Sequence, residues 1–250
     1  MPDSHDEAMR NEFNLWAADG RGQGMERQHD SIATQTIAAM RLQPGERVLD
    51  LGCGIGWATR RMARLVQGAA PERPREFGQA VGIDISDEMI RQARELSAEV
   101  ENALFVWGSA HEIPWQEDYF HKALSIEAFY YCHDQPQVLG ELRRVLAPRG
   151  ELYILINLYR DNPYSLRWVE HLQVPVAIHS ADEYTEMLRQ AGFAKAAWQH
   201  VSDLSPTPES YTGRWFANAD ELREYKRIGA LLLSARKPDK TSPPRAVESC

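Results

Sequence analysis

Short apolar runs along this chain alternate with segments in which apolar residues recur every three or four positions. The short runs are typical of buried β-strands, and the recurring pattern is typical of amphipathic helices. The expected strands are, in chain order, Arg47–Leu51, Ala80–Ile83, Ala103–Trp107, Lys122–Ile126, Leu152–Ile156, Ala194–Val201 and Ile228–Ala235. Since helical patterns separate most of them, the chain is predicted to form an α/β domain around a largely parallel sheet.

Three stretches break this alternation. Residues 157–179 and 204–219 are irregular and aromatic, and we expect them to be insertions that cap the sheet. Residues 1–30 contain three closely spaced glycines, which predict either a mobile flap over a ligand or a poorly ordered leader. The Pro- and Ser-rich residues 237–250 are expected to be a disordered tail. The α/β domain therefore occupies residues 31–236.

Composition narrows the class of protein. The 250 residues carry a formal net charge of −8, which disfavours nucleic-acid binding, because that depends on Lys and Arg at phosphates. No apolar run approaches the roughly 20 residues that span a membrane, and the N-terminus lacks the apolar core of a secretory signal. The three cysteines are far apart and show no metal-ligand spacing. We expect a cytoplasmic protein with no metal site, no nucleic-acid partner and no membrane span.

A glycine loop follows the first expected strand. Its glycines stand at alternate positions, Gly52, Gly54 and Gly56, where backbone without a Cβ can take positive φ and let a ligand come close. A dinucleotide loop needs a further glycine where this chain has Trp57, which disfavours an oxidoreductase, and the lysine of a Walker loop is missing. Asp50, just before the first glycine, has the charge to meet a cation. The loop therefore predicts a nucleotide-like cofactor that carries positive charge.

A second acidic residue ends the next expected strand. Asp84 follows Val81-Gly82-Ile83, and a carboxylate at a strand tip can accept hydrogen bonds from both hydroxyls of a ribose. Alternatively, Asp84 or Ser86 caps the helix that begins near Asp87. The loop over residues 67–79 makes the distance between Asp84 and the glycine loop long.

Together these motifs resemble class I S-adenosylmethionine (SAM) methyltransferases, in particular the small-molecule branch called methyltransferase type 11. The resemblance covers roughly residues 32–156 and the last strand, and includes Gly108 to Pro114 and Ala123 to Asp134. It implies a Rossmann-like, doubly wound sheet of seven mostly parallel strands, the last antiparallel, with SAM as cofactor. The cofactor-binding residues that it implies are Asp50, Gly52, Cys53, Gly54, Gly56, Asp84, Ile85, Met89, Ser109, Ala110 and Ile126.

The resemblance also implies where each part of the cofactor binds. The glycine loop would hold the methionine portion, Asp50 its ammonium group and Asp84 the ribose. Ser109 stands where the family has an aspartate that binds the adenine amino group. A hydroxyl would accept that hydrogen bond without charge assistance, at about half the strength, and backbone at Ala110 could share the task. Met89 would pack against the adenine, although core packing accounts for it equally well.

Candidate catalytic residues follow the fourth expected strand. If the acceptor must lose a proton, His133, beside Tyr130 and Tyr131, is the first candidate for the base, with a surface histidine as the alternative reading. Glu127 could instead orient the acceptor, and His29 is a further candidate base.

The aromatic insertions bear on the acceptor. Their composition suits a small, partly apolar or aromatic molecule, although it would also suit a dimer interface, so a monomer and a homodimer both stay open. The sequence predicts a SAM-dependent methyltransferase that acts on a small molecule by in-line displacement. The alternatives are a protein or RNA methyltransferase and a non-catalytic SAM-binding protein.

Overall fold

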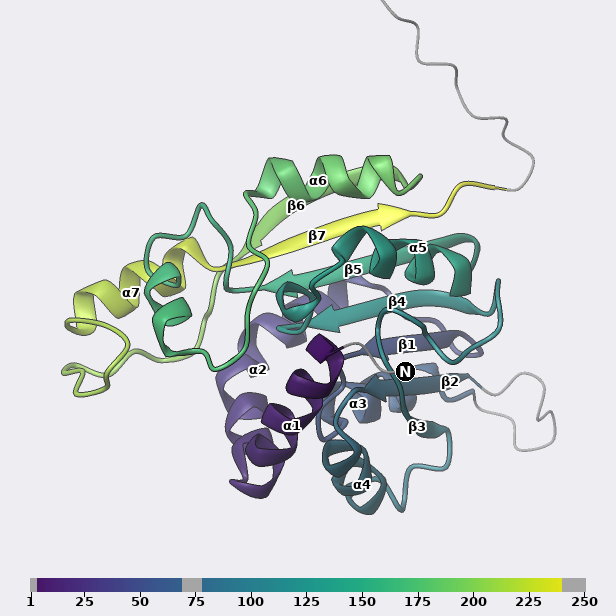
Figure 1. Ribbon diagram of the computed structural model, residues 1–250, viewed down its shortest axis with the longest axis horizontal. Helices are drawn as coiled ribbons and strands as arrows, with labels where there is room; N and C mark the ends of the chain where they lie inside the picture. The colour runs from purple at the N-terminus through teal and green to yellow at the C-terminus, as the bar shows by residue number, and fades with distance from the viewer. Residues whose placement is uncertain (1–3, 69–77, 240–250) are drawn as a thin grey trace, which may run out of the picture.

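The structure, a computed structural model that describes residues 4–68 and 78–239, is built around one seven-stranded sheet (Figure 1). The strands are β1 (Arg47–Leu51), β2 (Gln79–Asp84), β3 (Ala103–Trp107), β4 (Phe120–Ile126), β5 (Leu146–Ile156), β6 (Ala194–Val201) and β7 (Ala230–Arg236). Their order across the sheet is β3-β2-β1-β4-β5-β7-β6. Strands β1 to β5 pair in parallel, and β7 runs antiparallel to both β5 and β6. The predicted fold class and the antiparallel last strand are confirmed.

Helices cover both faces of the sheet. They are α1 (Ser4–Ala18), α2 (Arg21–Ala39), α3 (Trp57–Val66), α4 (Asp87–Leu96), α5 (Gln135–Val145), α6 (Ala181–Gln190) and α7 (Ala219–Ile228), with short 3-10 helices η2 (Phe129–Tyr131) and η3 (Leu166–His171). Apolar residues of α5 and α6 pack on one face of the central strands, and those of α2 and α3 pack on the other. Because alternate strand residues point to opposite faces, both cores draw on the same strands.

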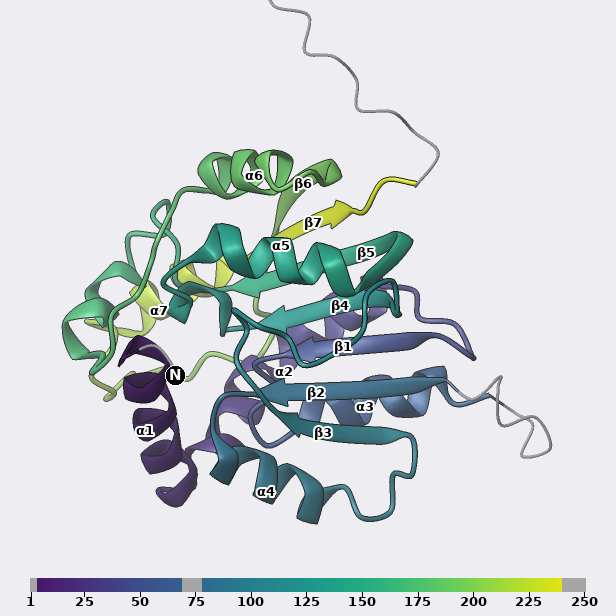
Figure 2. The ribbon, with the colours of Figure 1, turned by 45° about the vertical axis from the view of Figure 1, so that its right-hand side comes forward.

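The glycine loop follows β1 directly and therefore lies at the carboxyl end of this strand. In Figure 2 the parallel strands β1 to β4 point toward α1, which lies beyond their carboxyl ends. Ligands of doubly wound sheets bind at this edge. A capping box begins α6, with Ser180 and Glu183 bonded reciprocally to each other's backbone.

The N-terminal segment is helical. Residues 4–30, predicted to be either a flap over a ligand or a poorly ordered leader, form α1 and the first half of α2. Gly22 lies within α2, and a Cβ there would approach Ile55 Cγ2 to 2.6 Å, so this glycine permits close packing of α2 on the glycine loop. Glycine signals chain mobility and close approach alike, and the sequence could not tell them apart.

Other differences are smaller. Strand β5 begins at Leu146 instead of Leu152, because its first residues pair with Phe120 across an irregularity in the ladder. The insertion over residues 157–179 is irregular apart from η3, as expected. Residues 69–77 of the predicted long loop and 240–250 of the predicted tail lie outside the described residues. Among the helices that the structure describes, none has the length and apolar character to cross a membrane.

Candidate functional site

The three glycines of the loop have different roles. A Cβ on Gly52 would lie 2.2 Å from Ala128 Cβ, and one on Gly56 would lie 2.2 Å from Phe105 Cε1. A Cβ on Gly54 would meet nothing within 4 Å, although Gly54 also has positive φ, at +52°. Gly52 and Gly56 are therefore required by packing of the protein itself, whereas Gly54 faces open space in a cavity.

Asp84 holds this loop in place. The backbone N–H of Gly54 donates to Asp84 Oδ2 at 2.8 Å, and that of Ser86 donates to Oδ1 at 2.9 Å. Ser86 also caps α4, since its hydroxyl accepts a hydrogen bond from Met89 N at 3.0 Å. Burial raises the pKa of Asp84. Each carboxylate oxygen can still accept a further hydrogen bond from a ligand.

Asp50 lies beneath the loop and is 2% exposed. Its Oδ2 accepts a hydrogen bond from Thr59 Oγ1 at 2.6 Å. Burial, together with the nearby charge of Asp84, raises the pKa of Asp50 to about 7. A cationic ligand group would stabilise both ionised carboxylates, so this wall of the cavity favours positive charge.

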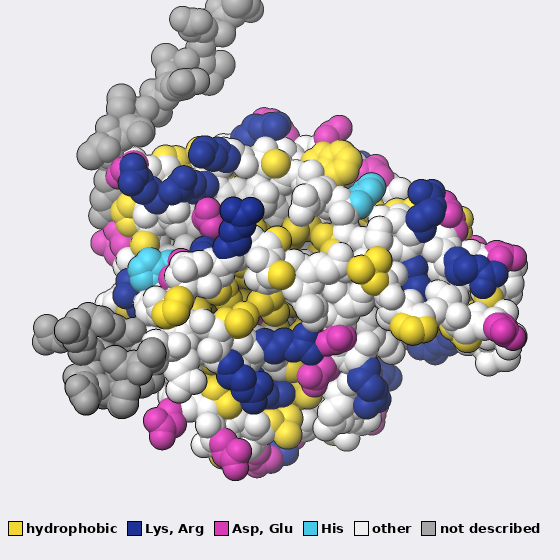
Figure 3. Space-filling model, turned by 180° about the vertical axis from the view of Figure 1, so that it is seen from behind, with side chains coloured by type: hydrophobic (Ala, Val, Ile, Leu, Met, Phe, Trp, Pro, Cys, Tyr) yellow, Lys and Arg dark blue, Asp and Glu magenta, His cyan; other side chains and the backbone are white. Residues whose placement is uncertain are grey.

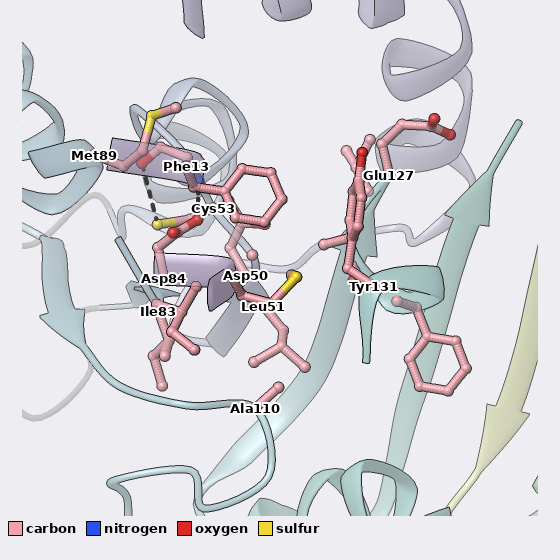
Figure 4. Close-up of a pocket in the computed structure, with 18 of the residues that line it drawn as sticks. Phe13, Asp50, Leu51, Cys53, Ile83, Asp84, Met89, Ala110, Glu127 and Tyr131 are labelled. Atoms are coloured by element: carbon pink, nitrogen blue, oxygen red, sulfur yellow. Dashed lines mark hydrogen bonds between the residues drawn. The ribbon is translucent and has the colours of Figure 1, made fainter. Parts of the chain in front are cut away.

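The first cavity opens at the carboxyl ends of β1, β2 and β4. Figure 4 shows Asp84 and Met89 on one side of it and Glu127 and Tyr131 on the other. The predicted cofactor residues that line it are Asp50, Gly52, Cys53, Gly54, Asp84, Ile85, Met89, Ser109, Ala110 and Ile126. Gly56 is not among its lining residues, because it faces Phe105 behind the loop. Residues of α1 and α2, from the segment predicted to be either a flap over a ligand or a leader, also line it: Asp6, Met9, Phe13, Gly22 and Met25.

Ser109 is joined to the N-terminal helix. Its hydroxyl donates to Asp6 Oδ2 at 2.5 Å and accepts a hydrogen bond from His111 N at 3.1 Å. The methyltransferases that the sequence resembles have an aspartate at the position of Ser109. Asp6 therefore supplies a carboxylate beside a position that lacks one in this chain. The two residues are 103 positions apart, and no local pattern in the sequence indicated the contact.

Glu127 is the most constrained residue between β4 and η2. It is 5% exposed and has a φ of +53°, which is strained for a residue with a side chain. Its carboxylate accepts hydrogen bonds from Asn157 N at 2.5 Å and from the Tyr130 hydroxyl at 3.1 Å. Burial raises its pKa to about 7.

His29 faces Glu127 from α2, with Nε2 lying 3.9 Å from Oε2. Burial lowers the pKa of His29 to about 4, so the imidazole is neutral near pH 7 and the two side chains do not form an ion pair there. A buried acid that titrates near neutrality and a neutral imidazole therefore lie side by side. Such a pair suits proton transfer.

A second cavity adjoins the first, and the two share Met25, His29, Glu127 and Tyr131 as lining residues. Aromatic side chains from α1, η2, the two insertions and α7 line it: Trp16, Tyr130, Tyr131, Trp168, Trp215, Phe216 and Tyr225. The indole N–H of Trp168 is buried and has no hydrogen-bond partner among the described residues. The second cavity is thus an aromatic chamber.

His133 is placed differently from the other predicted catalytic residues. It is not among the residues that line either cavity, whereas Tyr130 lines the second and Glu127 lines both. Its ring lies against those of His5 and His111, with centroids 4.5 and 4.2 Å away. The structure therefore brings Glu127, Tyr130 and His29 together without His133, whose role as a base stays a prediction.

Comparison with known proteins gives a consistent result. A family model described as a methyltransferase domain matches residues 42–197. The 27-O-demethylrifamycin SV methyltransferase of Amycolatopsis mediterranei is 28% identical over 82% of this chain and 83% of its own length. Methyltransferase phqN of Penicillium fellutanum is 32% identical over 68% of this chain, which spans about half (52%) of that relative.

One solved structure is similar over nearly its whole length. It is a chain of the complex between the Haloferax volcanii Trm112 methyltransferase activator and a methyltransferase. Its sequence is 32% identical, with a TM-score of 0.82, over 91% of this chain and 98% of that one. The similarity therefore covers most of both chains.

Proposed function

Given that this chain belongs to the methyltransferase domain family and is a class I SAM-dependent methyltransferase, we propose that it methylates a small organic acceptor held in the aromatic cavity beside Glu127. One observation carries the proposal. The first cavity, which the glycine loop lines, meets the aromatic chamber at Glu127, His29 and Tyr131. A donor in the first cavity and an acceptor in the second would therefore meet beside a candidate base.

The residues of the first cavity fit SAM. Gly54 leaves space for a ligand to approach the backbone, and Asp50 and Asp84 favour a cation. The hydroxyl of Ser125 is buried at the same cavity and has no partner among the described residues, as expected where a polar ligand binds. We assign the ribose to Asp84 and the adenine to the end of the cavity at Ala110.

When bound, SAM supplies an electrophilic methyl group on a sulfonium, which an acceptor nucleophile can take by in-line displacement. The protein orients the acceptor, and holding two reactants in line can contribute roughly 7–11 kcal/mol. Glu127, ionised above pH 7, accepts a proton from the acceptor directly or through His29. Tyr130 and the backbone of Asn157 hold the carboxylate in place through their hydrogen bonds to it.

Several observations favour a small acceptor. The aromatic lining of the second cavity suits a flat or apolar molecule. On the face shown in Figure 3, Lys and Arg side chains are interspersed with Asp and Glu and form no broad basic field for RNA. The Amycolatopsis relative is named for a small-molecule substrate.

Thermal unfolding tests both halves of the proposal. S-adenosylhomocysteine at a hundred times its dissociation constant should add about 2.7 kcal/mol of stability, and NADH should add none. Turnover is then measured against phenols, hydroxylated polycyclic molecules, peptides and RNA. Stabilisation by NADH alone would refute SAM binding. Stabilisation by S-adenosylhomocysteine with turnover on RNA or peptide alone would refute the small-molecule acceptor, and binding with no turnover on any class would indicate a non-catalytic SAM-binding protein.

A second proposal concerns a protein partner. The similar solved chain is in a complex with a Trm112 activator, and this chain has an open sheet edge that could take an added strand. The edge strand β3 is uncharged, and its Leu104 and Trp107 are 40% and 49% exposed. The opposite edge, β6, carries Lys195, a residue type that discourages strand addition. An activator of the Trm112 class would bind at β3 by main-chain pairing.

Co-purification tests this partner. The chain is co-expressed with a Trm112 protein from the same cell type, and complex formation is measured by size-exclusion chromatography. Leu104→Glu should abolish the complex, whereas Lys195→Glu on the opposite edge should leave it intact. A complex that survives Leu104→Glu, or the absence of any complex with the parent chain, would refute pairing at β3.

A further inference from the structure

A cluster of histidines and a carboxylate lies at the rim of the first cavity, outside the proposed chemistry. Asp6 comes from α1, His111 from the loop after β3, and His133 from the segment after η2. One ligand atom from each of these three side chains lies within 4.8 Å of the other two. Three segments that are distant in the sequence thus bring together one carboxylate oxygen and two imidazole nitrogens.

We propose that Asp6, His111 and His133 bind a first-row transition-metal dication such as Zn²⁺, which fastens α1 over the first cavity. Imidazole and carboxylate are ligands that such ions accept. With metal–ligand bonds of about 2.0–2.1 Å, ligand atoms in a tetrahedral site lie about 3.3 Å apart. The distance from Asp6 Oδ1 to His111 Nδ1 is 3.2 Å, which already matches one edge of that tetrahedron.

The surroundings prepare these groups for a metal. Without metal, the proton on His111 Nδ1 lies between that nitrogen and Asp6, and a cation takes its place on binding. The proton then moves to Nε2. Nε2 thereby loses the long hydrogen bond that it accepts from Asp134 N at 3.4 Å.

Two further features define the geometry of the proposed metal site. Ser109 donates to the other oxygen of Asp6 at 2.5 Å and so orients the carboxylate, as outer-shell partners do in metal sites. The ligand atom of His133 already lies within 4.8 Å of those of Asp6 and His111, so a small rearrangement completes the site and leaves the fourth position to water. Asp6 and His111 also line the first cavity. Bound metal would therefore limit opening of the cavity at α1.

Cobalt binding tests the site. The full chain, with no affinity tag, is titrated with Co²⁺, and the visible absorption of the bound ion and calorimetry report stoichiometry and affinity. One ion per chain with micromolar or tighter affinity is expected. Loss of even an outer-shell partner weakens metal binding roughly 10- to 100-fold, so His111→Gln and Asp6→Asn should each weaken it by at least that much. His200→Gln, a change at an imidazole on the distant β6, should have no effect.

Hydrogen exchange supplies the second measurement, since Co²⁺ should slow amide exchange in α1 of the parent chain and not in His111→Gln. Circular dichroism and thermal unfolding without ligand show whether each variant is folded. Binding at millimolar Co²⁺ only, or equal binding by the parent, Asp6→Asn and His111→Gln, would overturn the proposal. Because the readouts are metal binding and exchange, they do not depend on the acceptor proposal.

Discussion

A methyl group added at Gly54 should separate ligand binding from folding. The variant Gly54→Ala places a Cβ where the protein has no atom within 4 Å. Its folding cost is the left-handed backbone alone, since φ is +52° there, and this amounts to about 1–2 kcal/mol. For a chain of this size, that lowers the melting temperature by roughly 2–8 °C.

The affinity for the ligand should fall as well, for a separate reason. Overpacking by one methyl group typically costs about 1–3 kcal/mol, which corresponds to a roughly 5- to 150-fold loss of affinity. We therefore expect S-adenosylhomocysteine, which stabilises the parent by roughly 5–11 °C at a hundred times its dissociation constant, to bind Gly54→Ala much more weakly. Gly54→Val should abolish binding.

Gly56→Ala is the matched control, because its Cβ would lie 2.2 Å from Phe105 Cε1 and not in the cavity. Strain and overpacking together should cost about 2–5 kcal/mol of stability. Calorimetry with S-adenosylhomocysteine and thermal unfolding without it measure the two effects separately. If folded Gly54→Ala binds S-adenosylhomocysteine as tightly as the parent does, the loop does not contact the ligand and the site assignment is wrong.

Four further predictions concern residues of the two cavities. Since the pKa of Glu127 is about 7, kcat for an acceptor that loses a proton should rise as pH increases through 7. Glu127→Gln should lower kcat and abolish this dependence on pH. Burial raises the pKa of Glu127 above its unfolded value, so the folded parent loses a stabilising proton as pH rises through 7. The stability of Glu127→Gln relative to the parent should therefore increase between pH 5 and pH 8. A difference in melting temperature that does not change with pH would contradict the burial argument. Trp168→Ala removes part of the aromatic wall of the second cavity and should raise KM for an aromatic acceptor with little change in S-adenosylhomocysteine affinity, so equal KM values would show that the acceptor does not contact this side chain. Asp84→Asn should weaken S-adenosylhomocysteine binding in calorimetry, since Asp84 orients Gly54, and parent-like affinity would exclude it from the site.

Local sequence patterns were sufficient for the sheet and one wall of the site. The strands and the glycine loop follow from short-range apolar patterns and from the conformational freedom of glycine, so Gly54 and Asp84 were found correctly as cavity residues. Gly56 carried the same signal for a different reason, namely its contact with Phe105. Sequence spacing does not distinguish a glycine required by a ligand from one required by a neighbouring ring.

Contacts between distant segments account for what the sequence did not predict. Asp6 meets Ser109 across 103 positions, and His29 meets Glu127 only because α2 packs against the end of β4. Both pairs depend on where α1 and α2 lie, and that follows from packing on the sheet. His133 follows β4 closely in the chain, yet nearness in sequence did not place it at either of the two described cavities.

Transfer of a labelled methyl group tests the central claim most directly. The parent chain, Gly54→Val and Glu127→Gln are incubated with trideuteromethyl SAM and a panel of small aromatic hydroxyl compounds, and the products are analysed by mass spectrometry. We predict a trideuteromethylated small molecule from the parent, no product from Gly54→Val and a strongly reduced yield from Glu127→Gln. A label found only on RNA or peptide, or equal product from the parent and Gly54→Val, would contradict the account.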